Sequence, residues 1–256
     1  MTSLYGSNAM TAGYAAYRPP LHALILERAR PHLRPAGKAP RALDVGCGAG
    51  LSTRALRSLA EQCVGIEPVE AMLGAAAATA PGCAFAAARA EAIPLRDRSI
   101  DLITAAGSLN YVDLGRFFAE AARVLVPDGA VLVYDFSPGR EFRDSPALRQ
   151  WFAAFVARYP WPADGAAELD PERLGKLRHG FDLRGAEEFE IGIPLARRFY
   201  LEYMMTETNV ASAVRNGRAE ASIREWCAET LADAWPDGER EVLFRGYWAC
   251  LVHHGR

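Results

Sequence analysis

Short apolar runs alternate with longer stretches of helical spacing over the first half of the chain. Five of these runs are predicted to be strands, at 41–45, 63–67, 83–88, 100–105 and 130–136. Between them, apolar residues recur every three or four positions, as in 114–125, which predicts amphipathic helices. Strands that alternate with helices favour parallel βαβ units with right-handed crossovers. The pattern therefore predicts an α/β fold with a doubly wound, mostly parallel sheet.

The regular alternation ends near residue 137. The stretch 137–187 mixes aromatic, proline and charged residues with a helical patch at 147–156, so we expect an insertion that covers a pocket as a lid. Period-two alternation returns at 188–194 and 197–201, and the apolar run 241–253 predicts a strong final strand.

The turn after the first predicted strand carries the most specific chemistry. Asp44 lies in that strand, and Gly46, Gly48 and Gly50 follow two residues apart before a helical stretch that begins at Leu51. Glycine permits backbone angles that a Cβ obstructs and lets a ligand approach the main chain. A strand that leads through glycines to a helix N-terminus favours an anion or nucleotide site, although three glycines could also form only a turn.

A second acidic residue, Glu67, ends the next predicted strand. A carboxylate at that place can accept hydrogen bonds from both hydroxyls of a ribose. The alternative is that Glu67 only places a negative charge before the next helix.

Five segments together resemble one family in their order and spacing. The segments are 43–50, 65–72, 90–95, 99–103 and 123–130. They are similar to the class I S-adenosylmethionine-dependent methyltransferases, in particular the small-molecule branch of ubiquinone/menaquinone and trans-aconitate methyltransferases. The resemblance is good over 14–136 and loose elsewhere. It implies a Rossmann-like, seven-stranded sheet whose last strand lies antiparallel between strands five and six.

The resemblance also implies S-adenosylmethionine as the cofactor and a set of residues that hold it. Asp44, Gly46, Gly48 and Gly50 would form the wall under the methionine part, and Glu67 would hold the ribose diol. Met72, Ala90 and Glu91 would lie at the adenine. Ala106 would lie beside the methionine part.

The N-terminal segment 14–20 resembles the part that folds over the cofactor in this branch, so residues 1–40 are expected to form covering helices. The ring of Tyr14 could face the sulfonium charge, and Arg18 could pair with the methionine carboxylate. Alternatively, Tyr14 and Tyr17 anchor a helix on the core.

Candidates for acid–base chemistry are few, because methyl transfer from a sulfonium depends mainly on positioning the acceptor. His179 in the expected lid, and Asn110 and Tyr111 in the loop after the fourth strand, are the candidates. That strand end lacks the aspartate expected of a metal-dependent catechol enzyme, so we expect no metal.

Composition narrows the function further. The chain has 256 residues, half of them hydrophobic, and a net charge of −2, which suits one domain over 1–256 and disfavours nucleic-acid partners. Its five cysteines form no CxxC pair and suggest reduced thiols in the cytoplasm. No signal peptide or membrane span is expected, and the protein would be a monomer or homodimer.

We therefore expect a cytoplasmic, metal-independent methyltransferase that acts on a small molecule, at oxygen. Three alternatives stay open at this point. The chain could bind the cofactor without transferring a methyl group, as a regulator or partner subunit. It could methylate tRNA or protein, or it could use the same pocket for a different reaction.

Overall fold

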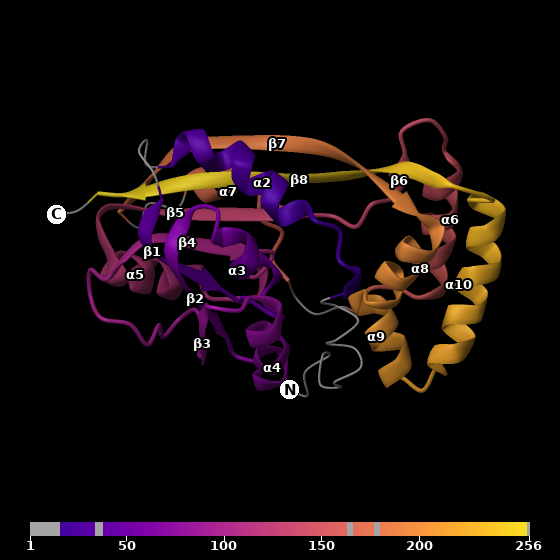
Figure 1. Ribbon diagram of the computed structural model, residues 1–256, viewed down its shortest axis with the longest axis horizontal. Helices are drawn as coiled ribbons and strands as arrows, with labels where there is room; N and C mark the ends of the chain where they lie inside the picture. Colours follow the sequence, from indigo (N-terminus) through magenta and orange to yellow (C-terminus); the bar gives the residue numbers. More distant parts are fainter. Residues whose placement is uncertain (1–15, 34–37, 163–165, 177–179, 255–256) are drawn as a thin grey trace. The chain divides into compact units, whose positions relative to one another are not determined.

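The computed structural model describes residues 16–33, 38–162, 166–176 and 180–254 (Figure 1). The chain divides into two compact units. The helical unit comprises 1–19, 137–164 and 189–245, and the sheet unit comprises 20–136, 165–188 and 246–256. Two long strands, β7 (Phe181–Ala196) and β8 (Glu239–His253), contribute residues to both units.

The sheet unit is built on five parallel strands. They are β1 (Ala39–Val45), β2 (Ala60–Glu67), β3 (Ala84–Ala87), β4 (Ile100–Ala106) and β5 (Leu125–Phe136). β1 lies between β2 and β4, β3 pairs with β2, and β5 pairs with β4. The predicted doubly wound, mostly parallel sheet is confirmed.

The final strand closes the sheet in the predicted orientation. β8 pairs antiparallel with β5, from Ala130 opposite Val252 to Phe136 opposite Gly246, and it also pairs with β7. The described residues form an eight-stranded sheet rather than the predicted seven, because the two-residue strand β6 (Glu141–Phe142) adds to β8.

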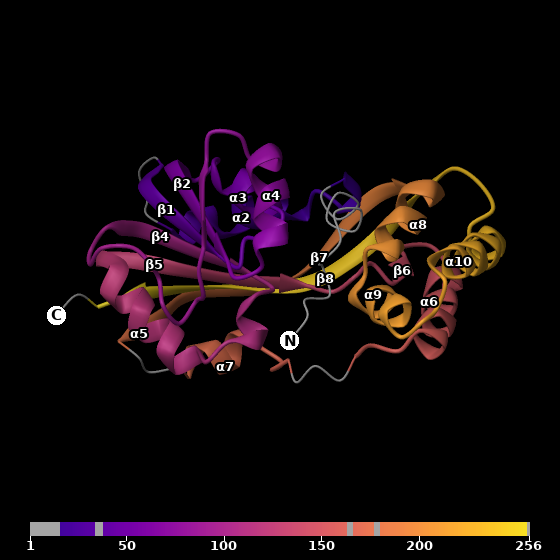
Figure 2. The ribbon, with the colours of Figure 1, turned by 90° about the horizontal axis from the view of Figure 1, so that it is seen from below.

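Helices cover both faces of this sheet unit (Figure 2). One face carries α2 (Leu21–Ala29), α3 (Leu51–Leu56) and α4 (Glu70–Thr79). The other carries α5 (Leu114–Val124) and α7 (Pro171–Gly175). The 3-10 turn η1 (Arg30–His32) follows α2, and the 3-10 turn η2 (Leu109–Tyr111) follows β4. Phe117 and Phe118 of α5 are fully buried against strand residues such as Ile103 and Val131. This apolar packing fixes the strand ends on which the candidate site is built.

The start of β5 differs from the prediction. The strand begins at Leu125 rather than at 130, directly after α5, and its register against β4 shifts so that Leu125 faces Ile100 while Ala130 faces Leu102. Pro127–Gly129 lie between the predicted helix 114–125 and the predicted strand 130–136, and in the structure they form an irregularity inside the strand, with Asp128 at φ 60°.

The helical unit has an aromatic core of its own. Its helices are α6 (Ala147–Arg158), α8 (Arg197–Met205), α9 (Thr208–Arg215) and α10 (Glu220–Ala234) (Figure 1). Trp151 and Phe155 of α6 stack with ring centroids 5.2 Å apart, and Tyr200 and Tyr203 of α8 are fully buried. No helix among the described residues is long and apolar enough to cross a bilayer.

The expected strand at 197–201 is wrong, because these residues begin helix α8. Over five residues, alternation and helical spacing are hard to separate. The buried side chains Tyr200, Tyr203 and Met204 recur at three- and four-residue steps, which is the spacing of one helix face.

Candidate functional site

The turn from Gly46 to Gly50, here called the glycine turn, needs glycine for two separate reasons. Gly46, Gly48 and Gly50 have φ of 69°, 51° and 86°, which L side chains rarely adopt. A Cβ on Gly46 would lie 2.4 Å from the Cβ of Ser108, and one on Gly50 would lie 2.9 Å from the Cα of Ala76. The loop after β4 and helix α4 therefore press on the turn at its two ends.

The middle of the glycine turn is open by comparison. A Cβ on Gly48 would meet only the terminal methyl of Met72, at 3.5 Å, an ordinary contact. The Gly48 N–H donates to Oε2 of Glu67 at 3.2 Å, and the Val69 N–H donates to Oε1 at 3.0 Å. The structure thus brings Gly48, Glu67 and Met72 together around uncrowded backbone.

Glu67 is mostly buried, and burial raises the pKa of its carboxyl, while the two backbone N–H groups oppose that rise. Each carboxylate oxygen accepts one of these hydrogen bonds and keeps a further lone pair. Glu67 therefore holds the glycine turn in place, and its carboxylate can still accept hydrogen bonds from the two hydroxyls of a diol.

Asp44 is enclosed beneath the turn with no exposed surface. Its Oδ2 accepts hydrogen bonds from the hydroxyls of Ser52 and Thr53, both at 2.6 Å, and its Oδ1 accepts one from Thr104 at 2.9 Å. Burial raises the pKa of Asp44, and the three hydroxyls oppose that rise. Asp44 thus joins β1, α3 and β4 beneath the wall rather than at its surface. The Ser-Thr pair after Leu51 was the sequence signal for these donors.

The other expected cofactor residues of the sheet unit lie on the same carboxyl ends of the strands or on the loops that follow. Ala90 is buried, and Oε1 of Glu91 accepts a hydrogen bond from the Asp113 N–H at 3.2 Å. Ala106 ends β4 opposite Tyr134 of β5 and is only partly buried.

Arg18 belongs to the helical unit and has a carboxylate partner there. Its Nη1 lies 2.8 Å from Oε1 of Glu207, and its Nη2 donates to the Thr206 carbonyl at 3.3 Å. Its guanidinium lies 5.0 Å from the ring centroid of Tyr203. Burial raises the pKa of Glu207, and the charge of Arg18 opposes that rise. Tyr14, like His179, lies outside the described residues.

The two candidates in the loop after β4 differ in their surroundings. Tyr111 is 60% exposed, whereas the Asn110 side-chain amide donates to Oδ2 of Asp135 at 3.0 Å. Sequence reasoning missed Asp135. The available signal was an acidic residue near the end of the fifth strand, as Asp44 and Glu67 are near the ends of the first two.

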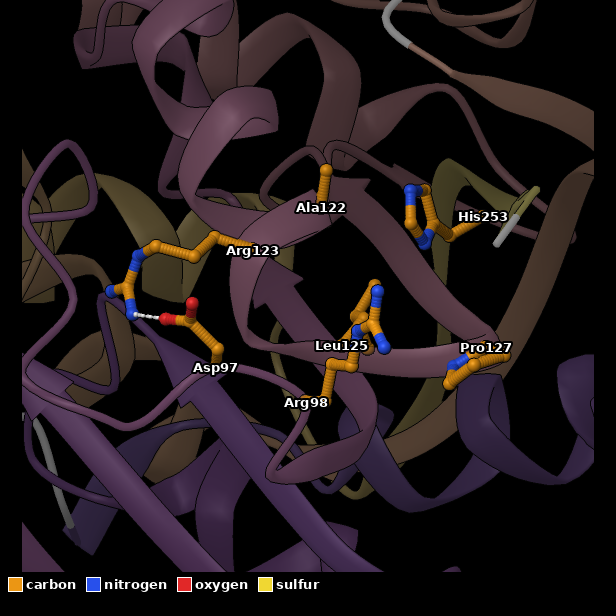
Figure 3. Close-up of a pocket in the computed structure, with 7 residues that line it drawn as sticks. All are labelled: Asp97, Arg98, Ala122, Arg123, Leu125, Pro127 and His253. Carbon is orange, nitrogen blue, oxygen red and sulfur yellow. Dashed lines mark hydrogen bonds and ion pairs between the residues drawn. The ribbon is translucent and has the colours of Figure 1, made fainter. Parts of the chain in front are cut away.

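A separate cavity of about 230 Å³ lies at the opposite ends of the strands (Figure 3). Its lining includes Arg98, Arg123, Leu125 and His253. Arg123 is held by Asp97 at 2.8 Å and by Glu120. The cavity is therefore unrelated to the glycine turn. Within the described ranges, no three His, Cys, Asp or Glu side chains gather as metal ligands.

Gly48, Glu67 and Met72 fit a nucleoside. The uncrowded backbone at Gly48 leaves room for a ligand to lie against the main chain. The carboxylate oxygens of Glu67 beside it can accept hydrogen bonds from the hydroxyls of a sugar. The thioether of Met72, only 5% exposed, supplies an apolar wall.

Comparisons with known proteins agree with this geometry. Residues 43–133 match the family described as "Methyltransferase domain". An uncharacterized methyltransferase of Mycobacterium bovis is 36% identical over 110 residues, which are 40% of this chain and 45% of that protein. A ubiquinone biosynthesis O-methyltransferase of Rhodopseudomonas palustris is 30% identical over 171 residues, 63% of this chain and 65% of that protein. The chain thus spans about half the length of the mycobacterial relative.

A solved structure extends the similarity along the chain. A putative type II methyltransferase from Anaeromyxobacter dehalogenans matches with a TM-score of 0.65 and 26% identity, over 93% of this chain and 98% of that one. Residues 43–133 therefore carry a methyltransferase domain, and nearly the whole chain shares its fold with a putative methyltransferase.

Proposed function

We propose that this chain transfers a methyl group from S-adenosylmethionine to an oxygen atom of a small organic acceptor. It works without a metal ion, in the cytoplasm, as a monomer or homodimer. The observation that supports the cofactor is the uncrowded backbone of Gly48 beside the carboxylate of Glu67, at the carboxyl ends of β1 and β2. The activity named for the Rhodopseudomonas palustris relative supports oxygen as the acceptor atom.

In this proposal the glycine turn and Ala106 lie along the methionine part, and Glu67 accepts hydrogen bonds from the ribose. Met72, Ala90 and Glu91 surround the adenine. The bound cofactor supplies an electrophilic methyl group on a sulfonium. The protein holds the acceptor oxygen in line with that methyl and excludes water, which is where most of the rate gain arises in such a displacement. The cover formed by 1–40 and the lid at 137–187 stay predictions.

Glu67→Ala tests the ribose contact. We expect the variant to bind S-adenosylhomocysteine at least about 30-fold more weakly in isothermal titration, because two charge-assisted hydrogen bonds of together about 2 kcal/mol or more are lost. Glu70→Ala, an exposed acidic residue at the start of α4, is the matched control.

An analogue that lacks the ribose 2′-hydroxyl separates a direct contact from a loosened turn. The wild-type protein should bind it more weakly than S-adenosylhomocysteine, and Glu67→Ala should bind the two alike. An equal preference for the ribose in both proteins would contradict the assignment.

Arg18→Met tests the carboxylate contact proposed for Arg18. We expect weaker binding of S-adenosylhomocysteine and unchanged binding of 5′-methylthioadenosine, which lacks the amino-acid part. If both ligands lose affinity equally, Arg18 acts through its ion pair with Glu207 and not through the ligand.

Labelled cofactor identifies the acceptor. The protein is incubated with [methyl-¹⁴C]S-adenosylmethionine and a metabolite extract, and we expect label on a small molecule, as a methyl ether, with or without EDTA. Label only on RNA or protein would overturn the small-molecule proposal. Tight binding without any transfer would favour a cofactor-binding regulator.

A further inference from the structure

Asp135 lies where β5 ends, next to the loop that follows β4. Its Oδ2 accepts a hydrogen bond from the Asn110 amide at 3.0 Å, and its Oδ1 accepts one from the Phe136 N–H at 2.8 Å. A Cβ on Gly107 would lie 2.9 Å from Oδ1, so the carboxylate rests against glycine backbone one residue beyond Ala106. The carboxylate is therefore held in one orientation beside the place proposed for the methionine part.

Tyr247 of β8 lies directly opposite Asp135 in the antiparallel pair with β5. Residues opposite one another in such a pair project from the same face of the sheet. The Tyr247 hydroxyl is buried and has no hydrogen-bond partner among the described residues. A buried hydroxyl normally has such a partner, which makes this one a candidate donor to a ligand.

The three acidic residues near the ends of β1, β2 and β5 are not equivalent. Asp44 is fully enclosed and accepts from three hydroxyls, and Glu67 is nearly buried and accepts from two N–H groups. Asp135 is only partly buried, and it lies opposite Tyr247, whose hydroxyl has no hydrogen-bond partner among the described residues. Of the three, Asp135 is the carboxylate with surface left for an acceptor.

We propose, resting on the proposed function, that Asp135 accepts the hydrogen bond and then the proton of the acceptor's hydroxyl, while Tyr247 donates to the same oxygen. The acceptor's O–H bond breaks and its proton moves to the carboxylate. The oxygen lone pair forms the new O–CH₃ bond, and the electron pair of the broken C–S bond stays on sulfur. Asn110 is a positioning residue that fixes the carboxylate. The acceptor class is an organic hydroxyl compound.

The electrostatics agree with this role. Burial raises the pKa of Asp135, and the hydrogen bonds from Asn110 and Phe136 oppose that rise. The titratable group opposite Asp135 is Tyr247, whose pKa is raised first by burial and then by the charges of Asp135 and of Asp170 at the start of α7. A carboxylate with a raised pKa is a stronger proton acceptor.

Phenol and its methyl ether anisole form a matched pair of probes, because only phenol can donate a hydrogen bond. The pKa of the Asp135 carboxyl is followed by ¹³C NMR in the protein with S-adenosylhomocysteine, and Asp135→Asn identifies the resonance. Phenol should lower this pKa, because it stabilises the charged carboxylate, and anisole should not. Asn110→Ala without any probe should raise it, since one opposing hydrogen bond is lost.

Binding of the same probes gives a second measurement. Asp135→Asn should bind phenol about tenfold more weakly and anisole unchanged. Tyr247→Phe, which removes only a hydroxyl without a described partner, should also lose affinity for phenol. Asp101→Asn, a carboxyl near the other end of β4 that accepts the Arg41 N–H at 3.0 Å, should behave as the wild type.

The outcomes separate this inference from the proposed function. If phenol and anisole act alike on the Asp135 pKa, or if Asp135→Asn keeps the full preference for phenol, the inference is overturned. Unchanged affinity of Asp135→Asn for S-adenosylhomocysteine would leave the proposed function standing in that case. Loss of all cofactor binding in the wild type would overturn both.

Discussion

At the scale of single residues, glycine is required in the glycine turn for two different reasons, a positive φ and the lack of space for a Cβ. Gly46 combines a positive φ with contact against Ser108, whereas Gly82 has a similar φ of 84° and would have no atom within 4 Å of an added Cβ. A residue with a Cβ would have a strained backbone at both positions, but of the two only Gly46 lacks space for the Cβ itself.

Gly46→Ala should therefore destabilise the protein by about 2 kcal/mol more than Gly82→Ala, measured by urea unfolding. The pair cancels the cost of a positive φ and isolates the contact with Ser108. Equal losses would mean that the Ser108 loop moves aside, and that the turn is less confined than its geometry indicates.

At the scale of elements, Asp44 connects β1, α3 and β4 through three hydroxyl donors. Because burial raises its pKa in the folded protein, its titration contributes stability that is present at low pH and declines as pH rises from the unfolded value toward the folded one. At neutral pH, burial therefore disfavours the ionised Asp44 carboxylate, while the three hydroxyl donors favour it.

Asp44→Asn should be destabilising, by about 1–3 kcal/mol, since an amide cannot accept all three hydroxyls. The difference from the wild type should be larger near pH 4 than near pH 7, as ionised Asp44 costs stability in the wild type alone. Urea unfolding at a series of pH values measures this. A difference that grows with pH would contradict the raised pKa.

Sequence patterns located the strands and helices of the sheet unit because their apolar runs alternate regularly and are bounded by glycine, proline or acidic residues. The start of β5 could not be read in this way, since Pro127–Gly129 have the composition of a turn but lie inside a strand. The Arg18–Glu207 pair was beyond reach as well, because it joins positions far apart in the chain. The same reason hid the pairing of Asn110 with Asp135.

At the scale of the whole molecule, the proposed cofactor residues other than Tyr14 and Arg18 belong to the sheet unit. A ligand that binds only the folded state adds stability to the part that it contacts. S-adenosylhomocysteine should thus slow amide hydrogen exchange in β1, β2 and β4 more than in α6 and α10. Mass spectrometry of peptic fragments measures this, and equal slowing in all of them would show that the two units open together.

The helical unit is assembled from three separate lengths of chain, 1–19, 137–164 and 189–245, and β7 and β8 continue from it into the sheet unit. Recombination of a single gene fragment therefore cannot exchange that unit between relatives. The helical unit is therefore expected to diversify by successive point substitutions rather than by recombination, and engineering of it should follow the same route.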